Sequence, residues 1–286
     1  RLQKELRDAG FTIRTGVAEM PTAFVAEYGS GKPVIGILAE MDALPGVSQA
    51  AVPERSPLRG RISGHACGHH LFGTASTSAG IALKNWLASN RRSGTIRIYG
   101  TPAEEGGAGK AYMVRAGLFD DVDVALHWHA GDRNTVTNEP TLANKSAKFR
   151  FYGVAAHASA APERGRSALD AVEAMNFMAN LMREHMPEDA RMHYIITRGG
   201  DAPNVVPEFA EVFYYVRHRN PQVMAELFDR LVKTSEAAAL GTGTRVEHEV
   251  IHGAFSLLPN DVLANVVDGN LRKVGGITYD AAEQAF

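Results

Sequence analysis

Three short apolar runs, each followed by a polar turn, constrain the fold of the first half of this chain. They cover Pro33–Ala39, Thr95–Tyr99 and Val122–Leu126, and their lengths are typical of strands buried inside a sheet. Helical spacing of small and apolar residues predicts helices over Leu71–Leu87 and Ala111–Ala116. Because strands and helices alternate, the sequence predicts an α/β domain with a mostly parallel sheet, whose loops beyond the strand ends carry the chemistry.

The pattern changes after about Asn144. Lys148–Tyr152 alternates polar and apolar residues, which is typical of a strand exposed on one face. The elements that follow are predicted in the order β-α-β-β-α-β, with helices over residues 167–183 and 222–239 and strands near residues 193–197, 211–216 and 245–250. We therefore expect a first domain over residues 1–143 and a smaller α+β domain inserted over residues 144–253. Residues 254–286 would return to the first domain, and we expect that part to be truncated because no stop signal precedes Phe286.

The composition argues against several classes of partner. Acidic and basic residues nearly cancel, with a net charge of −2, and the basic residues are scattered. Neither nucleic acid nor a membrane surface is therefore expected as a partner. No apolar stretch approaches the roughly 20 residues that span a bilayer. The single cysteine excludes an internal disulfide, so we expect a reducing, cytoplasmic location.

The segment Ser63–His70 contains this cysteine and three histidines. Gly68 separates Cys67 from His69, and glycine permits a turn that directs a thiolate and an imidazole at one cation. A lone cysteine is more often a small buried side chain, but the pair favours metal binding. His65 and His70 are expected to form hydrogen bonds around such a site rather than to bind the metal.

Two more strand ends carry candidate ligands. Glu104 and Glu105 follow the second apolar run, and adjacent carboxylates on a turn point in different directions, so one can bind metal while the other acts as a base. A solvated acidic turn is the alternative. His127 and His129 follow the third run, and alternation would send both side chains to one face. The residues alone do not choose between these two histidines.

Three segments, residues 64–69, 102–107 and 200–207, resemble motifs of the M20 metallopeptidase and amidohydrolase family. Within that family they are similar to the amino-acid-amide hydrolase branch that cleaves p-aminobenzoyl-glutamate. The resemblance implies a metal-dependent hydrolase of N-acyl or N-aroyl amino acids, with p-aminobenzoyl-glutamate or a related folate fragment as the expected substrate. The alternatives are an M20 dipeptidase, an N-acetyl amino acid deacetylase, or a non-catalytic protein that binds carboxylates or metal.

The resemblance also implies two divalent ions, Zn or Mn, and assigns residues to them. The ligands of these two ions would be Cys67, His69, Glu105 and His129, with Glu104 as the general base. Glu40 stands where other branches carry a ligand histidine, so Glu40 and Asp42 are expected beside the site. The last ligand of the family is a histidine in a C-terminal segment, and nothing after His252 supplies it. The chain as given is therefore expected to have an incomplete site.

In the inserted domain the resemblance implies three further site residues. His157 would stabilise the developing oxyanion and reach the site of a partner subunit, which implies a homodimer formed through this domain. Asn204 and Arg217 would hold the substrate carboxylate. The alternative for Arg217 is a charged side chain at a strand end, with its head group in water.

Overall fold

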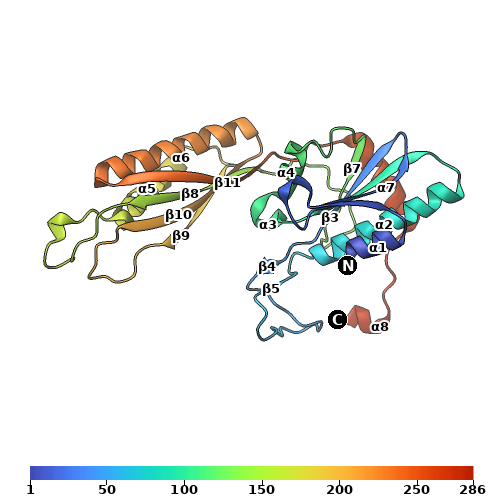
Figure 1. Cartoon of the computed structure of the whole chain (residues 1–286), viewed down its shortest axis with the longest axis horizontal. Helices are drawn as coiled ribbons and strands as arrows, with labels where there is room; N and C mark the ends of the chain where they lie inside the picture. The colour runs from blue at the N-terminus through green and yellow to red at the C-terminus, as the bar shows by residue number, and fades with distance from the viewer. Residues whose placement is uncertain (286) are drawn as a thin grey trace. The chain divides into compact units, whose positions relative to one another are not determined.

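The computed structural model describes residues 1–285, which form two compact units, each with its own sheet (Figure 1). The first unit is Arg1–Arg133, and the second begins at Asn134. The assignment of residues 254–286 to the first domain stays a prediction. Within residues 1–285, no helix combines the length and the apolar character needed to cross a bilayer.

The first unit contains the predicted α/β sheet. Its five strands, in the order β1-β2-β6-β3-β7, are β1 (Thr12–Thr15), β2 (Phe24–Ser30), β3 (Val34–Glu40), β6 (Gly94–Thr101) and β7 (Val124–Leu126). The other elements are α1 (Leu2–Asp8), η1 (Val17–Glu19), β4 (Leu44–Pro45), β5 (Ser63–Gly64), α2 (His69–Ser89), α3 (Glu104–Gly107) and α4 (Gly109–Arg115). Strands β6, β3 and β7 are parallel, as predicted, whereas β1 and β2 add antiparallel pairs and make the sheet mixed.

Helices cover both faces of this sheet. On one face, α2 packs against β3 and β6, and α1 packs against α2, β1 and β2, around Leu6, Phe24 and Ile98. On the other face, Met113 of α4 packs with Tyr99, whose hydroxyl donates to the Leu118 carbonyl at 2.8 Å. These two layers bury β3 and β6 and place the ends of the parallel strands at one edge of the sheet.

The second unit contains the predicted β-α-β-β-α-β order. Its four antiparallel strands, in the order β11-β8-β10-β9, are β8 (Ala143–Tyr152), β9 (Arg191–Arg198), β10 (Phe209–His218) and β11 (Arg245–Ala254). The helices are η2 (Pro162–Arg164), α5 (Ala168–Arg183), α6 (Pro221–Thr242), α7 (Asp261–Val274) and α8 (Ala281–Ala285). Side-chain oxygens of Ser167 and Asn220 accept hydrogen bonds at the first turns of α5 and α6, which defines where these helices begin.

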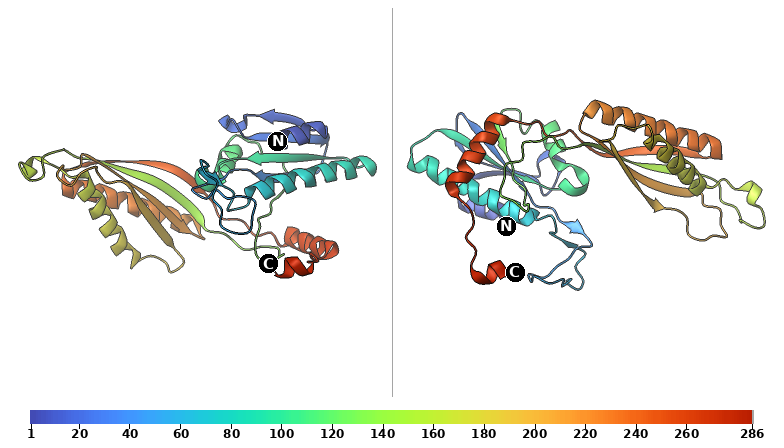
Figure 2. Two further views of the ribbon diagram at one scale, coloured as in Figure 1. Left: turned by 90° about the horizontal axis from the view of Figure 1, so that it is seen from below. Right: turned by 180° about the vertical axis from the view of Figure 1, so that it is seen from behind.

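Helices α5 and α6 lie side by side on one face of the four-stranded sheet (Figure 2). Phe149, Phe151 and Tyr214 point toward them and form the core of the unit. Because side chains alternate along a strand, the other residues of β8 and β10 lie on the opposite face. We call this the polar face, and its residues on these two strands are Asn144, Ser146, Lys148, Arg150, Tyr152, Phe209, Glu211, Phe213, Tyr215 and Arg217.

Candidate metal centre

A left-handed glycine shapes the turn that carries Cys67 and His69. Gly68 has φ 88° and stands at the N-cap of α2, where its carbonyl accepts the N–H of Leu71 at 2.8 Å. A residue with a Cβ atom disfavours this backbone region, so the glycine is needed for the turn. The turn brings both side chains to the end of the sheet where β3, β6 and β7 finish.

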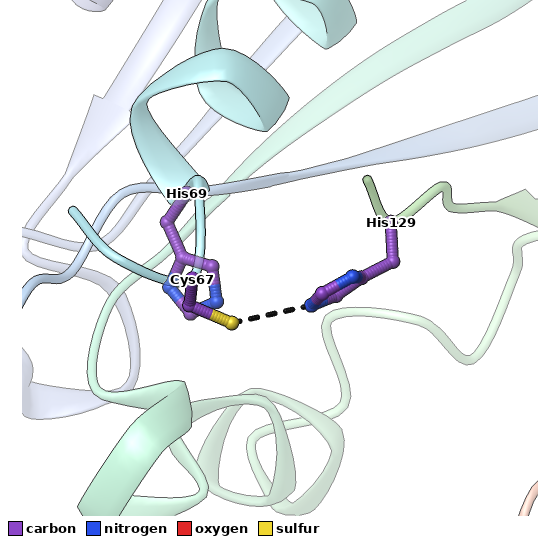
Figure 3. A group of neighbouring side chains, drawn as sticks. All are labelled: Cys67, His69 and His129. Atoms are coloured by element: carbon purple, nitrogen blue, oxygen red, sulfur yellow. Dashed lines mark hydrogen bonds between the residues drawn. The ribbon is translucent and has the colours of Figure 1, made fainter. Parts of the chain in front are cut away.

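Cys67, His69 and His129 meet at this edge (Figure 3). Nε2 of His129 lies 3.3 Å from Sγ of Cys67. Nδ1 of His129 lies 2.8 Å from the carbonyl oxygen of Ala130, so this nitrogen carries the proton and Nε2 keeps its lone pair for a ligand. One ligand atom from each of the three residues falls within 4.8 Å of the others, which is compact enough for a single ion.

The loop after β7 places the two candidate histidines next to different residues. The strand ends at Leu126, so strand alternation does not extend to His127 and His129. Nε2 of His127 lies 3.3 Å from Oε1 of Glu40, whereas His129 faces Cys67. The geometry therefore favours His129 as the ligand and places His127 beside the site.

Asp42 connects two of the candidate ligands. Its Oδ1 atom lies 2.9 Å from Nδ1 of His69, and its Oδ2 atom accepts the backbone N–H of Glu105 at 3.0 Å. A carboxylate on Nδ1 fixes the proton there and leaves Nε2 of His69 free to bind metal. Asp42 thus lies beside the site, as the sequence predicts.

Buried atoms without partners test whether these residues fit a metal. Nε2 of His69 and Oε1 of Glu105 are both buried, form no hydrogen bond and lie 3.8 Å apart, and Oε2 of the buried Glu40 lies 3.3 Å from the same nitrogen. Oε2 of Glu104 lies 3.9 Å from the same nitrogen. Leaving such atoms unpaired costs about 1–3 kcal/mol each, and a cation between them would remove that cost. The donor set of thiol, imidazole and carboxylate fits a divalent ion.

The two glutamates differ in exposure. The side chain of Glu104 is 45% exposed and that of Glu105 is 25% exposed. The division between a free base and a ligand stays a prediction. The short helix α3 lies between Ala103 and Ala108, which have φ values of 59° and 49°. Partial burial raises the pKa of Glu104, a change in the direction that suits a general base near neutral pH.

The Cys67 thiol is protonated in the absence of a cation. Burial, followed by the carboxylates of Glu105, Glu104 and Glu40, raises the pKa of Cys67 to about 11. A divalent ion bound to the sulfur would lower the pKa of Cys67, because a metal-bound thiol is deprotonated.

Lys110 is a residue of this region that sequence reasoning missed. Glu40 is only 2% exposed and pairs with Lys110 and with His127. Burial alone would raise the pKa of Glu40, but hydrogen bonds from His127 and Lys110 outweigh it and lower the pKa to about 2. The only available signal was a lone lysine in a run of small residues, close after the glutamate pair.

The remaining predicted residues lie in the second unit. Nδ1 of His157 accepts the backbone N–H groups of Ser159 and Ala160 at 3.3 and 3.2 Å, so its proton is on Nε2. The Asn204 carbonyl accepts the N–H of Ala158 at 2.9 Å, which pairs the segments of His157 and Asn204. Arg217 lies on β10, on the polar face.

Comparisons with known proteins show the family. Residues 36–281 match the model of peptidase family M20/M25/M40. A p-aminobenzoyl-glutamate hydrolase subunit of Escherichia coli (strain K12) is 46% identical over 100% of this chain and 60% of that protein. The Xaa-Arg dipeptidase of Mus musculus is 32% identical over 90% of this chain and 58% of that protein. The chain thus spans about three fifths of the length of these curated relatives.

A solved structure shares the fold. The YxeP protein of Bacillus subtilis, a dinuclear metal-binding peptidase of the M20 family, superimposes with a TM-score of 0.64. Its sequence is 21% identical, and the match covers 98% of this chain and 74% of that chain. With the family match over most of the sequence, these findings show that the chain belongs to peptidase family M20/M25/M40.

Proposed function

We propose that this chain is part of a metal-dependent amidohydrolase that cleaves N-acyl or N-aroyl amino acids, with p-aminobenzoyl-glutamate or a related folate fragment as substrate. The observation that carries the proposal is the pair of buried, unpartnered atoms, Nε2 of His69 and Oε1 of Glu105, beside Cys67, His129 and the more exposed Glu104. The 46% identity to a p-aminobenzoyl-glutamate hydrolase subunit supports the choice of substrate.

Cys67, His69, Glu105 and His129 would hold two divalent ions, zinc or manganese. Thiolate and imidazole favour zinc, while a set that includes carboxylates also accepts manganese. The ions would supply Lewis acidity, which lowers the pKa of water and polarises the amide carbonyl. The dinuclear YxeP protein, with the same fold, supports the number of ions.

The protein's own residues would move the protons and hold the substrate. Glu104 takes a proton from the attacking water and delivers it to the leaving amine. His157 donates from Nε2 to the developing oxyanion, a role that the hydrogen bonds to its Nδ1 support. Asn204 and Arg217 hold the carboxylate of the amino acid.

A homodimer formed through the second unit is part of the proposal. Strand β9 is at an edge of its sheet, and Ile195 on this strand is 62% exposed. Phe177 and Leu181, which are one helical turn apart on α5, are also exposed. An unpaired edge strand with apolar side chains is a ready surface for pairing with a second copy. We also propose a cytoplasmic location, which the single cysteine supports.

The test is turnover of a substrate panel by the full-length protein after metal removal and after addition of zinc or manganese. The panel includes p-aminobenzoyl-glutamate, N-acetyl amino acids and dipeptides that end in arginine, because an Xaa-Arg dipeptidase is 32% identical. We expect metal-dependent cleavage of p-aminobenzoyl-glutamate. Preferred cleavage of the dipeptides would assign the protein to the dipeptidases, and no cleavage in any metal-loaded form would contradict the proposal.

A further inference from the structure

The polar face of the second unit carries one group of basic side chains without carboxylate partners. Lys148 and Arg150 on this face are neutralised by Glu211, at 3.2 and 2.7 Å, and Arg150 also contacts Glu249 at 2.7 Å. Arg217, on the same face, forms no ion pair with any described residue between positions 1 and 285. Its charge is therefore available to an anion.

Two histidines flank Arg217 across the sheet. The strand register places His252 of β11, Ser146 of β8, Tyr215 of β10 and His193 of β9 at one level. The guanidinium carbon of Arg217 lies 5.3 Å from the centre of the Tyr215 ring, so the cation is close to one of the two central residues of this row. The Tyr215 and His252 rings lie 5.7 Å apart.

Three buried polar atoms of this region have no hydrogen-bond partner. They are Nε of Arg217, Oδ1 of Asn144 and Nδ1 of His252. Asn144 is only 8% exposed and is paired in register with Arg217. Buried polar atoms are normally satisfied, so the unpaired nitrogens of Arg217 and His252 on one face indicate a place for a polar ligand that accepts hydrogen bonds. The Asn144 oxygen is itself an acceptor and would need a donor instead.

The charges identify the ligand as an anion. Burial and then the charge of Arg217 lower the pKa of His193 and of His252, with Arg183 and Arg191 adding to the effect at His193. All of the charged groups that act on these histidines are thus cationic. A carboxylate would offset this repulsion and accept hydrogen bonds from the imidazoles.

We propose that His193 and His252, on either side of Arg217, bind the second carboxylate of a dicarboxylic amino acid and so select N-acyl glutamate over N-acyl amino acids with neutral side chains. This inference rests on the proposed function, in which Arg217 and Asn204 hold the first carboxylate. Neighbouring strands lie about 4.8 Å apart, so His193 is one strand away from Arg217, a separation that the two carboxylates of one short amino acid can span. His252 is two strands away on the other side, but its ring centre lies 5.7 Å from that of Tyr215, which is on the same strand as Arg217.

The test compares p-aminobenzoyl-glutamate with p-aminobenzoyl-glutamine, which has nearly the same shape and lacks one charge. We measure kcat and KM of the metal-loaded, full-length enzyme for both substrates. The wild type should favour the glutamate substrate by at least about tenfold in kcat/KM, since a hydrogen bond to a charged group is typically worth that much. In the double variant His193→Ala, His252→Ala this preference should disappear, mainly through a higher KM for the glutamate substrate.

The control is His185→Ala, which removes an exposed imidazole that follows α5 and should leave the preference unchanged. If the double alanine variant does not fold, the variant His193→Gln, His252→Gln decides, because it keeps polar side chains and removes the ring that can carry charge. An unchanged preference in the folded variant overturns the inference. So does a wild type that cleaves both substrates equally well, an outcome that leaves the proposed function intact. Cleavage of neither substrate by the wild type contradicts the proposed function itself.

Discussion

Nε2 of His129 lies 3.3 Å from Sγ of Cys67, although the two residues are 62 positions apart in the sequence. The contact joins the loop after β7 to the turn before α2, and it brings the thiol and the imidazole to within 4.8 Å of a ring nitrogen of His69. A thiolate and two imidazoles would be suitable ligands for zinc, so Cys67, His69 and His129 would hold such an ion together.

Metal bound to Cys67 should protect it from alkylation. We expect slow labelling by iodoacetamide in the metal-loaded protein and faster labelling after chelation, measured by mass spectrometry at about pH 9, where more of the thiol is ionised. The signal is unambiguous because the chain has one cysteine. Equal labelling rates in the two forms would mean that Cys67 only packs in the turn.

Glu104→Gln should lower kcat at least about 10²-fold while metal content is retained, because the variant loses the proton acceptor and keeps the ligands. Glu105→Gln is the matched control, since it changes the neighbouring carboxylate and should lose metal. Metal analysis and kinetics on the same preparations check both variants. Normal turnover by Glu104→Gln, or full metal content in Glu105→Gln, would show that the two roles are assigned incorrectly.

Asp42→Asn should weaken metal binding about 10–100-fold, because the uncharged amide no longer stabilises the orientation and basicity of His69. Isothermal titration with zinc measures the affinity. Asp8→Asn, on the exposed face of α1, removes the same charge at a distance and should have no effect. Equal affinities for the Asp42 variant and the wild type would remove Asp42 from the site.

The turn at Gly68 makes a further prediction. Gly68→Ala forces a Cβ atom into a backbone with φ 88°, and we expect the free energy of unfolding to fall by about 1–2 kcal/mol. Denaturant unfolding measures this change. Gly269→Ala in α7 is the control, because no other atom lies within 4 Å of the added methyl group and alanine favours helix. A Gly68→Ala variant as stable as the wild type would show that the turn relaxes at no cost.

Ile195→Lys should dissociate the proposed homodimer by placing a charge on the edge strand β9. Light scattering with sedimentation reports the mass. Ile62→Lys tests for a general effect of surface charge, because Ile62 is 86% exposed in the first unit. A dimer that survives the Ile195 change would exclude β9 from the interface.

Most strands and helices could be predicted because their sequence periods are clear. The buried strand at residues 33–39 is β3, the helix at 71–87 lies within α2, and the helices at 167–183 and 222–239 match α5 and α6 to within three residues. Strands β1 and β2 were missed. The run Thr12–Thr15 is short, mostly exposed and has a single apolar residue, whereas Phe24–Ser30 begins with buried residues but lacks the regular alternation of a half-exposed strand. Their antiparallel pairing depends on contacts with the rest of the sheet, so it leaves no local signal in the sequence.

The candidate site could be predicted only where residues are neighbours in sequence. The Cys-Gly-His and Glu-Glu motifs are recognisable in the sequence, and the structure brings both to one edge. The pairing of Lys110 with buried Glu40 depends on the fold of α4 against the sheet, which no local pattern records. Whether these residues bind metal stays a prediction.

The second unit separates stability from recognition along each strand. Residues that face α5 and α6 form its core, while the alternate positions supply the polar face. Mutations at the alternate positions can therefore change the proposed ligand contacts while the packing against the helices is retained. Glu211 is the exception, because it is buried and its loss would leave the charges of Lys148 and Arg150 without a partner.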